Sequence, residues 1–104
     1  MATLVLIPGV VVKDSACVIG MTPQMVRGAI TVGKAYATFG PYVCVLTSGV
    51  DGVHGPTSLH YWGQAADFRT RNVPADRRAG LRDAVKAALR RGFDVVLESD
   101  HLHV

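Results

Sequence analysis

The 104-residue sequence predicts an α+β domain in which a mainly antiparallel sheet is backed by two helices. Two segments carry apolar residues at helical spacing, and several short apolar runs, bounded by glycine, proline and polar residues, have the length of strands. The chain is long enough for one hydrophobic core and too short for two. Residues 1–104 are therefore expected to form a single domain, with any site on the rim of its core.

Capping residues mark the two helices. Thr22 and Pro23 supply an N-cap and a first-turn proline for the first helix, which is expected to end at Gly40. Pro74 opens the second helix, and Gly92 is expected to close it. The buried stripe of the second helix is predicted to consist of Leu81, Ala84, Val85, Ala88 and Leu89.

The predicted strands are short apolar runs, and one long segment is predicted to be a loop. Residues 49–63 include four glycines, a proline and two histidines, a composition that suits a loop around a site. The strands are expected at residues 1–7, 10–12, 42–46, 65–69, 93–97 and 101–104.

Composition narrows the classes of function. The formal net charge is +3, and the sequence lacks the aromatic platforms and base-reading motifs of nucleic-acid modules, so no nucleic-acid partner is expected. Cys17 and Cys44 lie among apolar residues and lack metal-ligand spacing, which favours two buried thiols over metal ligation, with a disulfide between them as the alternative. No apolar run reaches the roughly 20 residues that span a bilayer, and no basic segment precedes the first apolar run. We therefore expect synthesis in the cytoplasm without a signal peptide or membrane insertion.

The histidines point to a metal site. His54 and His60 lie in the predicted loop, and His101 and His103 lie at the end of the chain. Acidic residues accompany them, and a catalytic zinc ion needs three ligands of these types. On a strand, His101 and His103 would point to the same face. The carboxylates concerned are those of Asp67, Glu98 and Asp100.

The spacing between His60 and Asp67 requires a bend. Seven residues of straight strand would separate the two by about 23 Å, and a helix would separate them by about 10.5 Å along its axis. Neither element lets both side chains reach one ion at about 2 Å. Gly63 is the residue that permits the chain to fold back between them.

Two motifs resemble those of one family. The segment Ser58-Leu59-His60-Tyr61-Trp62-Gly63-Gln64-Ala65-Ala66-Asp67 is similar to the S-x-H-x-x-G-x-A-x-D signature of zinc D-Ala-D-Ala carboxypeptidases and phage L-alanyl-D-glutamate endopeptidases. The segment Glu98-Ser99-Asp100-His101-Leu102-His103 resembles the closing motif of that family. The likeness covers roughly residues 20–104 and implies the hedgehog/DD-peptidase fold, with a Zn²⁺ ion bound by His60 and Asp67.

The resemblance leaves two assignments for the third ligand and the general base. In relatives that end with D-H-x-H, the ligand corresponds to His103 and the base to Asp100. In relatives that end with E-x-x-H, the same roles fall on His101 and Glu98. The complete match to D-H-x-H favours His103 and Asp100, with His101 stabilising the developing oxyanion and Glu98 supporting the ligands.

The substrate-binding residues depart from the family pattern. Many relatives carry an arginine that grips a substrate carboxylate, where this chain has Val50-Asp51-Gly52. Either Arg69 or Arg71 takes that role, or the substrate lacks a terminal carboxylate at this place. Ser58 of the signature and His54 of the loop are further candidates for lining the groove.

The resemblance thus implies a zinc metallopeptidase that hydrolyses an amide bond of bacterial peptidoglycan, of the endolysin or carboxypeptidase type. A bacteriophage lytic enzyme that acts on the cell wall after release, or as part of a phage particle, is the form expected. The alternative is a non-catalytic zinc-binding module of the same fold, as in hedgehog signalling domains. The bond that is cut, the oligomeric state, and phage or bacterial origin stay open.

Overall fold

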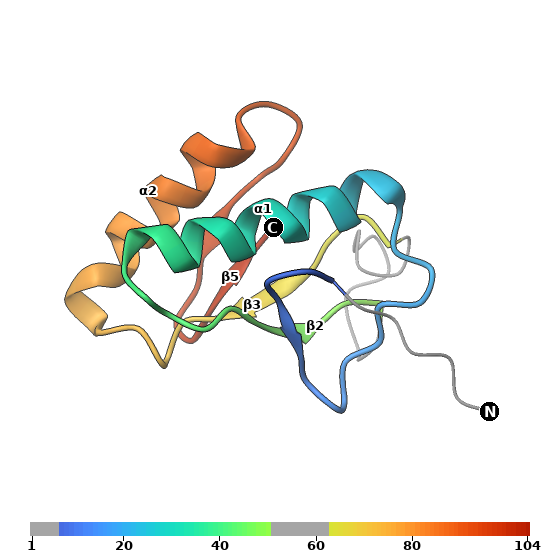
Figure 1. Cartoon of the computed structure of the whole chain (residues 1–104), viewed down its shortest axis with the longest axis horizontal. Coiled ribbons are helices and arrows are strands. Elements are labelled where there is room, and N and C mark those ends of the chain that lie inside the picture. The colour runs from blue at the N-terminus through green and yellow to red at the C-terminus, as the bar shows by residue number, and fades with distance from the viewer. Residues whose placement is uncertain (1–6, 51–62) are drawn as a thin grey trace.

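The computed structural model describes residues 7–50 and 63–104. In these residues two α-helices lie on one side of a five-stranded sheet (Figure 1). The helices are α1 (Pro23–Phe39) and α2 (Arg78–Leu89), and the short 3₁₀ helix η2 (Ala75–Arg77) leads into α2. The α+β class predicted from the sequence is confirmed.

Helix α1 begins and ends where its sequence predicts. The hydroxyl of Thr22 accepts a hydrogen bond from the backbone N–H of Met25 at 3.1 Å, which caps the first turn. Pro23 occupies the first turn, where the missing N–H has no helical partner to lose. The helix stops before Gly40 and buries one face against the sheet.

Helix α2 ends earlier than expected. Its last residue is Leu89, and Arg90 leaves the helix in the left-handed region with φ 62°, donating its N–H to the Lys86 carbonyl at 3.0 Å. Gly92 therefore lies beyond the helix and does not close it. The buried stripe is also narrower than predicted: it consists of Leu81, Val85 and Leu89, while Ala84 is half-buried and Ala88 exposed.

The sheet is mixed, which corrects the prediction of a mainly antiparallel sheet. Its order is β1-β2-β3-β5-β4; β1 runs parallel to β2, and the other neighbouring strands are antiparallel. The chain passes from β1 to β2 through α1, and a strand–helix–strand crossover returns the second strand in the direction of the first. The strands are β1 (Val11–Val12), β2 (Val45–Ser48), β3 (Asp67–Arg69), β4 (Val96–Leu97) and β5 (His101–His103).

These strands are shorter than the apolar runs that predicted them. Val43, from one of those runs, is exposed and precedes β2, so apolar character extends beyond the paired residues. The predicted strand at residues 1–7 falls largely outside the described residues, and Ile7 forms only an isolated bridge with Val10.

One row of register partners crosses the sheet and forms the floor of the core. Val12 pairs with Leu46, Leu46 with Phe68, and Phe68 with Leu102. The last three are fully buried in the same cluster as the inner faces of α1 and α2. Because side chains alternate along a strand, the residues beside this row point to the opposite face.

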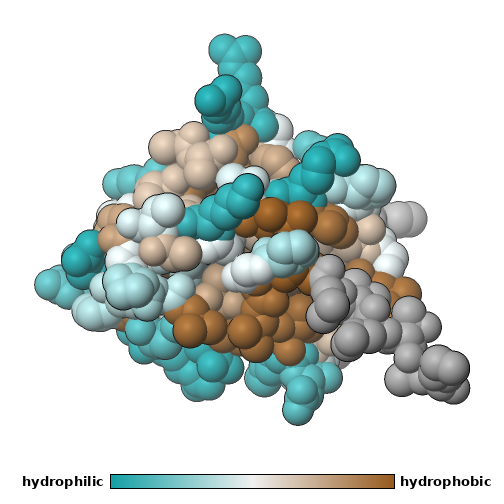
Figure 2. Space-filling model, in the orientation of Figure 1, coloured by the Kyte–Doolittle hydropathy of each residue, from teal (hydrophilic) through white to brown (hydrophobic). Residues whose placement is uncertain are grey.

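Cys44 is a buried free thiol, and Cys17 is half-buried. Figure 2 shows apolar surface in the middle of one face, with hydrophilic residues around its edge. In residues 7–50 and 63–104, no helix is long and apolar enough to cross a membrane.

Two arginines at the start of α2 contact neighbouring elements. Arg78 Nε donates to the Thr70 and Val73 carbonyls, each at 3.0 Å, and ties α2 to the segment after β3. Arg77 stacks over the Phe39 ring, 4.6 Å from its centroid, at the end of α1. Arg78 therefore joins α2 to the segment after β3, and Arg77 joins the start of α2 to the end of α1.

Candidate functional site

The pairing of β3 with β5 brings predicted site residues together. Asp67 is the register partner of His103, and Arg69 is the partner of His101. Phe68 and Leu102 lie between them and are buried on the helix side, so the four polar residues share the face away from the helices. The predicted common face of the two histidines is confirmed.

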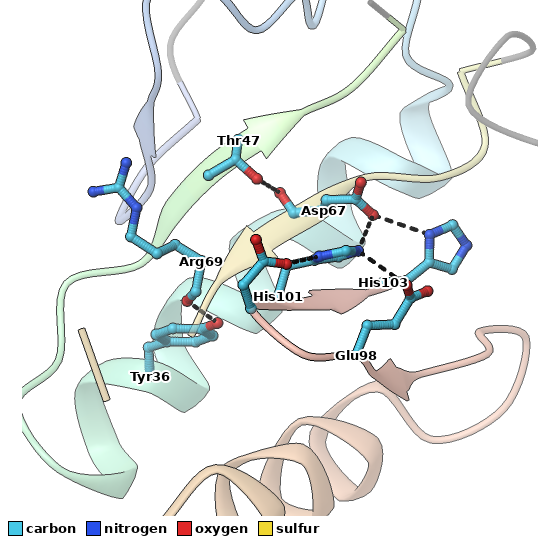
Figure 3. Close-up of polar contacts among 8 residues, drawn as sticks. Tyr36, Thr47, Asp67, Arg69, Glu98, His101 and His103 are labelled. Atoms are coloured by element: carbon cyan, nitrogen blue, oxygen red, sulfur yellow. Dashed lines mark hydrogen bonds and ion pairs between the residues drawn. The ribbon is translucent and has the colours of Figure 1, made fainter. Parts of the chain in front are cut away.

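Asp67 is the centre of this cluster. Its Oδ1 atom lies 3.0 Å from His103 Nδ1 and 3.7 Å from His101 Nε2. Glu98 Oε2 lies 3.6 Å from the same His101 Nε2. The Asp67 side chain is only 14% exposed, whereas that of Glu98 is 50% exposed. Figure 3 shows the two imidazoles and the two carboxylates turned toward one another.

The spacing of these atoms suits metal ligands. Two ligands about 2.1 Å from one tetrahedral zinc ion lie about 3.4 Å apart, which falls between the two distances from Asp67 to the imidazoles. Within residues 7–50 and 63–104, however, no group of three or more His, Cys, Asp or Glu side chains is arranged to hold a metal ion. A zinc ion here would therefore need a further ligand, the role that the sequence predicts for His60.

Asp100 lies on the other side of the His101 ring. Its Oδ1 atom accepts a hydrogen bond from His101 Nδ1 at 2.7 Å, and its side chain is 73% exposed. This hydrogen bond, and then the charge of His101, lower the pKa of Asp100, with a smaller contribution from Arg71.

Gly63 has the left-handed backbone conformation that the predicted bend requires, while His60 lies outside the described residues. The φ of Gly63 is +70°, and a Cβ built there would lie 2.1 Å from the carbonyl oxygen of Gly20. The Gly63 carbonyl accepts a hydrogen bond from the Thr22 N–H at 2.9 Å. The bend is thus packed against the start of α1, and only glycine fits.

Backbone contacts hold β3 beneath the site. The buried Tyr36 hydroxyl donates to the Arg69 carbonyl at 2.7 Å, and the Thr47 hydroxyl donates to the Asp67 carbonyl at 3.4 Å. Burial, and secondarily Cys44, raise the pKa of Tyr36, so its hydroxyl keeps its proton. Neither residue was anticipated from the sequence, although a tyrosine within the apolar stripe of a helix is a hint that its hydroxyl has a partner.

Two cavities flank the cluster. One, of about 450 Å³, lies at the His103 end, between the start of α1 and the segment before β4. The other, of about 270 Å³, lies at the His101 end. Arg69, Arg71 and Asp100 line the smaller cavity together with Lys13 and Thr47, which the sequence did not single out.

Three predicted site residues, His54, Ser58 and His60, lie outside the described residues. The described members divide into a central group of Asp67, His101, His103 and Glu98 and a flanking group with Asp100, Arg69 and Arg71. Comparison of the chain with protein-family models found no match. Comparison with curated proteins found none either.

Proposed function

We propose that the chain is a zinc-dependent peptidase that hydrolyses an amide bond in the peptides of bacterial peptidoglycan. The observation that carries the proposal is the approach of two imidazoles to Asp67, and of a second carboxylate to His101, on the face of the sheet away from the helices. The family resemblance of the two motifs supplies the substrate class. The proposed zinc ligands are His60, Asp67 and His103.

The chemistry divides between the ion and the chain. A zinc ion, when bound, polarises the scissile carbonyl and makes a bound water acidic enough to attack near neutral pH. A carboxylate of the chain takes the proton of that water and passes it to the leaving amine. The role proposed for His101, which contacts Asp67, Glu98 and Asp100, is to donate a hydrogen bond to the oxygen on which charge develops.

Asp100 and Glu98 are the two candidates for the base, and their positions differ. The D-H-x-H motif favours Asp100, which the structure holds on the Nδ1 side of His101. Glu98 lies on the Nε2 side of the same ring, with its Oε2 atom 3.6 Å from Nε2. The carboxylate that is not the base orients His101 or the ligands.

The test combines cell-wall digestion with metal analysis. Purified peptidoglycan is incubated with the zinc-loaded protein with and without a chelator, and the released peptide ends are identified. We expect release that stops on chelation and returns with zinc. Absence of release by a zinc-loaded, folded protein would contradict the peptidase and favour the non-catalytic zinc module.

Single substitutions separate ligand from base. Asp67→Asn should lower zinc affinity, and turnover with it. Asp100→Asn or Glu98→Gln, whichever removes the base, should keep one zinc per chain and lower kcat by at least about 100-fold. Asp83→Asn on the exposed side of α2 is the matched control and should leave both zinc content and kcat unchanged. Full turnover in both Asp100→Asn and Glu98→Gln would rule out a carboxylate base at this site.

A further inference from the structure

The two helices carry an excess of positive charge. Residues 23–39 and 75–91, which include α1 and α2, contain eight lysine and arginine side chains and two aspartates, so their formal charge is +6. The rest of the chain contains three such cations and six acids, a formal charge of −3. Positive charge is therefore concentrated on the helix side of the sheet, whereas the β3–β5 cluster lies on the other side (Figure 1).

A groove between the helices lies within this positive layer. Two cavities, of about 300 and 120 Å³, lie between α1 and α2, and Thr31 and Ala88 line both of them. Lys34 lines the larger cavity and Arg27 the smaller, and neither described lining contains an aspartate or a glutamate. The two cavities together form one groove, which we call the interhelical groove, with cations along its α1 side.

These cations are open to solvent and spaced along the groove. Arg27 and Lys34 are both exposed, and seven helical residues separate them by about 10.5 Å along the axis. Among the described residues, neither forms an ion pair. Arg77 stacks over Phe39 where the larger cavity ends. The groove thus presents a row of separated positive charges, which is complementary to an extended polyanion.

The remaining polar groups of the groove offer little beyond this charge. The hydroxyls of Thr31 and Thr38 donate to the Arg27 and Lys34 carbonyls, at 3.1 and 2.9 Å. Their protons are therefore not available to a ligand. The donors left to the groove are the cations and the Gln24 amide, and arginine and lysine are the usual partners of phosphate groups.

Two kinds of polyanion fit this surface less well than a simple phosphate chain does. Nucleic-acid bases stack on open aromatic faces, and one face of the Phe39 ring is covered by Arg77. Helices that bind anionic membranes also insert apolar side chains. The large apolar side chains that the described residues expose all lie outside the two helices: Val11, Ile19, Val43 and Val96.

We infer that the interhelical groove binds a linear polyol-phosphate polymer of the bacterial cell wall, with phosphates of the polymer contacting Arg27 and Lys34. The choice of a wall polymer rests on the proposed function. Because the β3–β5 cluster faces away from the helices, the chain can hold the polymer on one side while a peptide occupies the other. The polymer therefore retains the protein on the wall without covering the candidate site.

Binding is measured by NMR titration of the metal-free protein with purified glycerol-phosphate polymer. We expect shifts at the backbone amides of α1 and α2 and none at those of β3 and β5. A fourfold rise in salt concentration should weaken binding about sevenfold to twentyfold, as two or three phosphate contacts predict. Single-stranded DNA with the same number of phosphates, and vesicles that contain phosphatidylglycerol, are titrated in parallel and should bind more weakly than the polymer.

Substitutions on α1 test the two cations. Arg27→Gln and Lys34→Gln should each weaken polymer binding about twofold to fivefold, and the double variant should show the product of the two factors because the sites are far apart. Lys13→Gln removes an exposed lysine outside the helices. It is the charge-matched control and should bind the polymer as the native chain does. Circular dichroism verifies that each variant is folded.

The outcomes distinguish the inference from the proposed function. Absence of polymer binding by the native chain, or equal weakening by all three single substitutions, would overturn the groove even if zinc-dependent cleavage occurs. Tighter binding of the DNA or of the vesicles would overturn it in favour of a nucleic acid or a membrane. Polymer binding that depends on Arg27 and Lys34 supports the groove, and absence of cleavage after zinc loading would then overturn the peptidase alone.

Discussion

Gly63 shows how a single residue positions the candidate site. Its φ of +70° places the chain in a conformation that side chains with a Cβ rarely adopt, and the Gly20 carbonyl occupies the space where a Cβ would lie. Gly63→Ala should therefore lower the free energy of unfolding by about 2–4 kcal/mol, from backbone strain and steric overlap together. Urea unfolding followed by circular dichroism measures the loss.

Gly9 provides the control for Gly63. Its φ is +78°, but a Cβ there would meet nothing within 4 Å. Gly9→Ala should lower stability by only about 1 kcal/mol, since it introduces strain without overlap. Equal losses in the two variants would show that the contact with Gly20 does not decide the conformation of the bend.

Sequence alone could identify the individual side chains of the cluster better than their surroundings. His101 and His103 share a face because strand alternation requires it, and glycine was the only residue before Asp67 that could form the bend. Lys13 was not predicted to lie near the cluster, because its position there depends on the pairing of β1 with β2. These two strands are 30 or more residues apart in the chain. The contact of Tyr36 with Arg69 depends on the same long-range packing.

At the scale of elements, the start of α1 is coupled to the site. Thr22 caps the helix through its hydroxyl and binds the Gly63 carbonyl through its N–H. Thr22→Ala removes the first contact and should lower the free energy of unfolding by about 1 kcal/mol. Thr38→Ala is the control, because its hydroxyl bonds back to carbonyls within the helix and its loss should change stability by less than about 0.5 kcal/mol. A larger loss for Thr38→Ala than for Thr22→Ala would contradict the capping role.

Local sequence signals predict the ends of some helices and strands better than those of others. The limits of α1 follow from Thr22, Pro23 and Gly40, which act within one turn of the chain. The end of α2 at Leu89 could not be predicted from such signals, because Arg90 adopts the positive φ that glycine normally supplies at a helix end. The strand lengths and the parallel pairing depend on partners that are distant in sequence, which apolar patterning does not encode.

At the scale of the whole molecule, two buried acids make the fold sensitive to alkali. Burial raises the pKa of the Cys44 thiol from 9.0 to about 12, and burial, followed by Cys44, raises the pKa of Tyr36 above its ordinary value of 10.0. Below pH 9 both groups are protonated in the folded and the unfolded chain. Above it, the unfolded chain releases the Cys44 proton while the folded chain keeps it, so stability falls as pH rises toward 12.

The slope of stability against pH tests this linkage. Each group that loses its proton only on unfolding contributes about 1.4 kcal/mol per pH unit, so the native chain should lose stability steeply between about pH 10 and 11.5. Cys44→Ala should make that slope shallower by up to about 1.4 kcal/mol per pH unit, the contribution of one proton. It should also lower stability at neutral pH, because it leaves a cavity. Val45→Ala, a truncation at the next residue along the chain, should lower stability at every pH and leave the slope unchanged. The measurement is the urea midpoint of each chain from pH 8 to 11.5. Equal slopes for the native chain and Cys44→Ala would contradict the role of Cys44, because burial of its thiol would then contribute nothing to the alkaline transition.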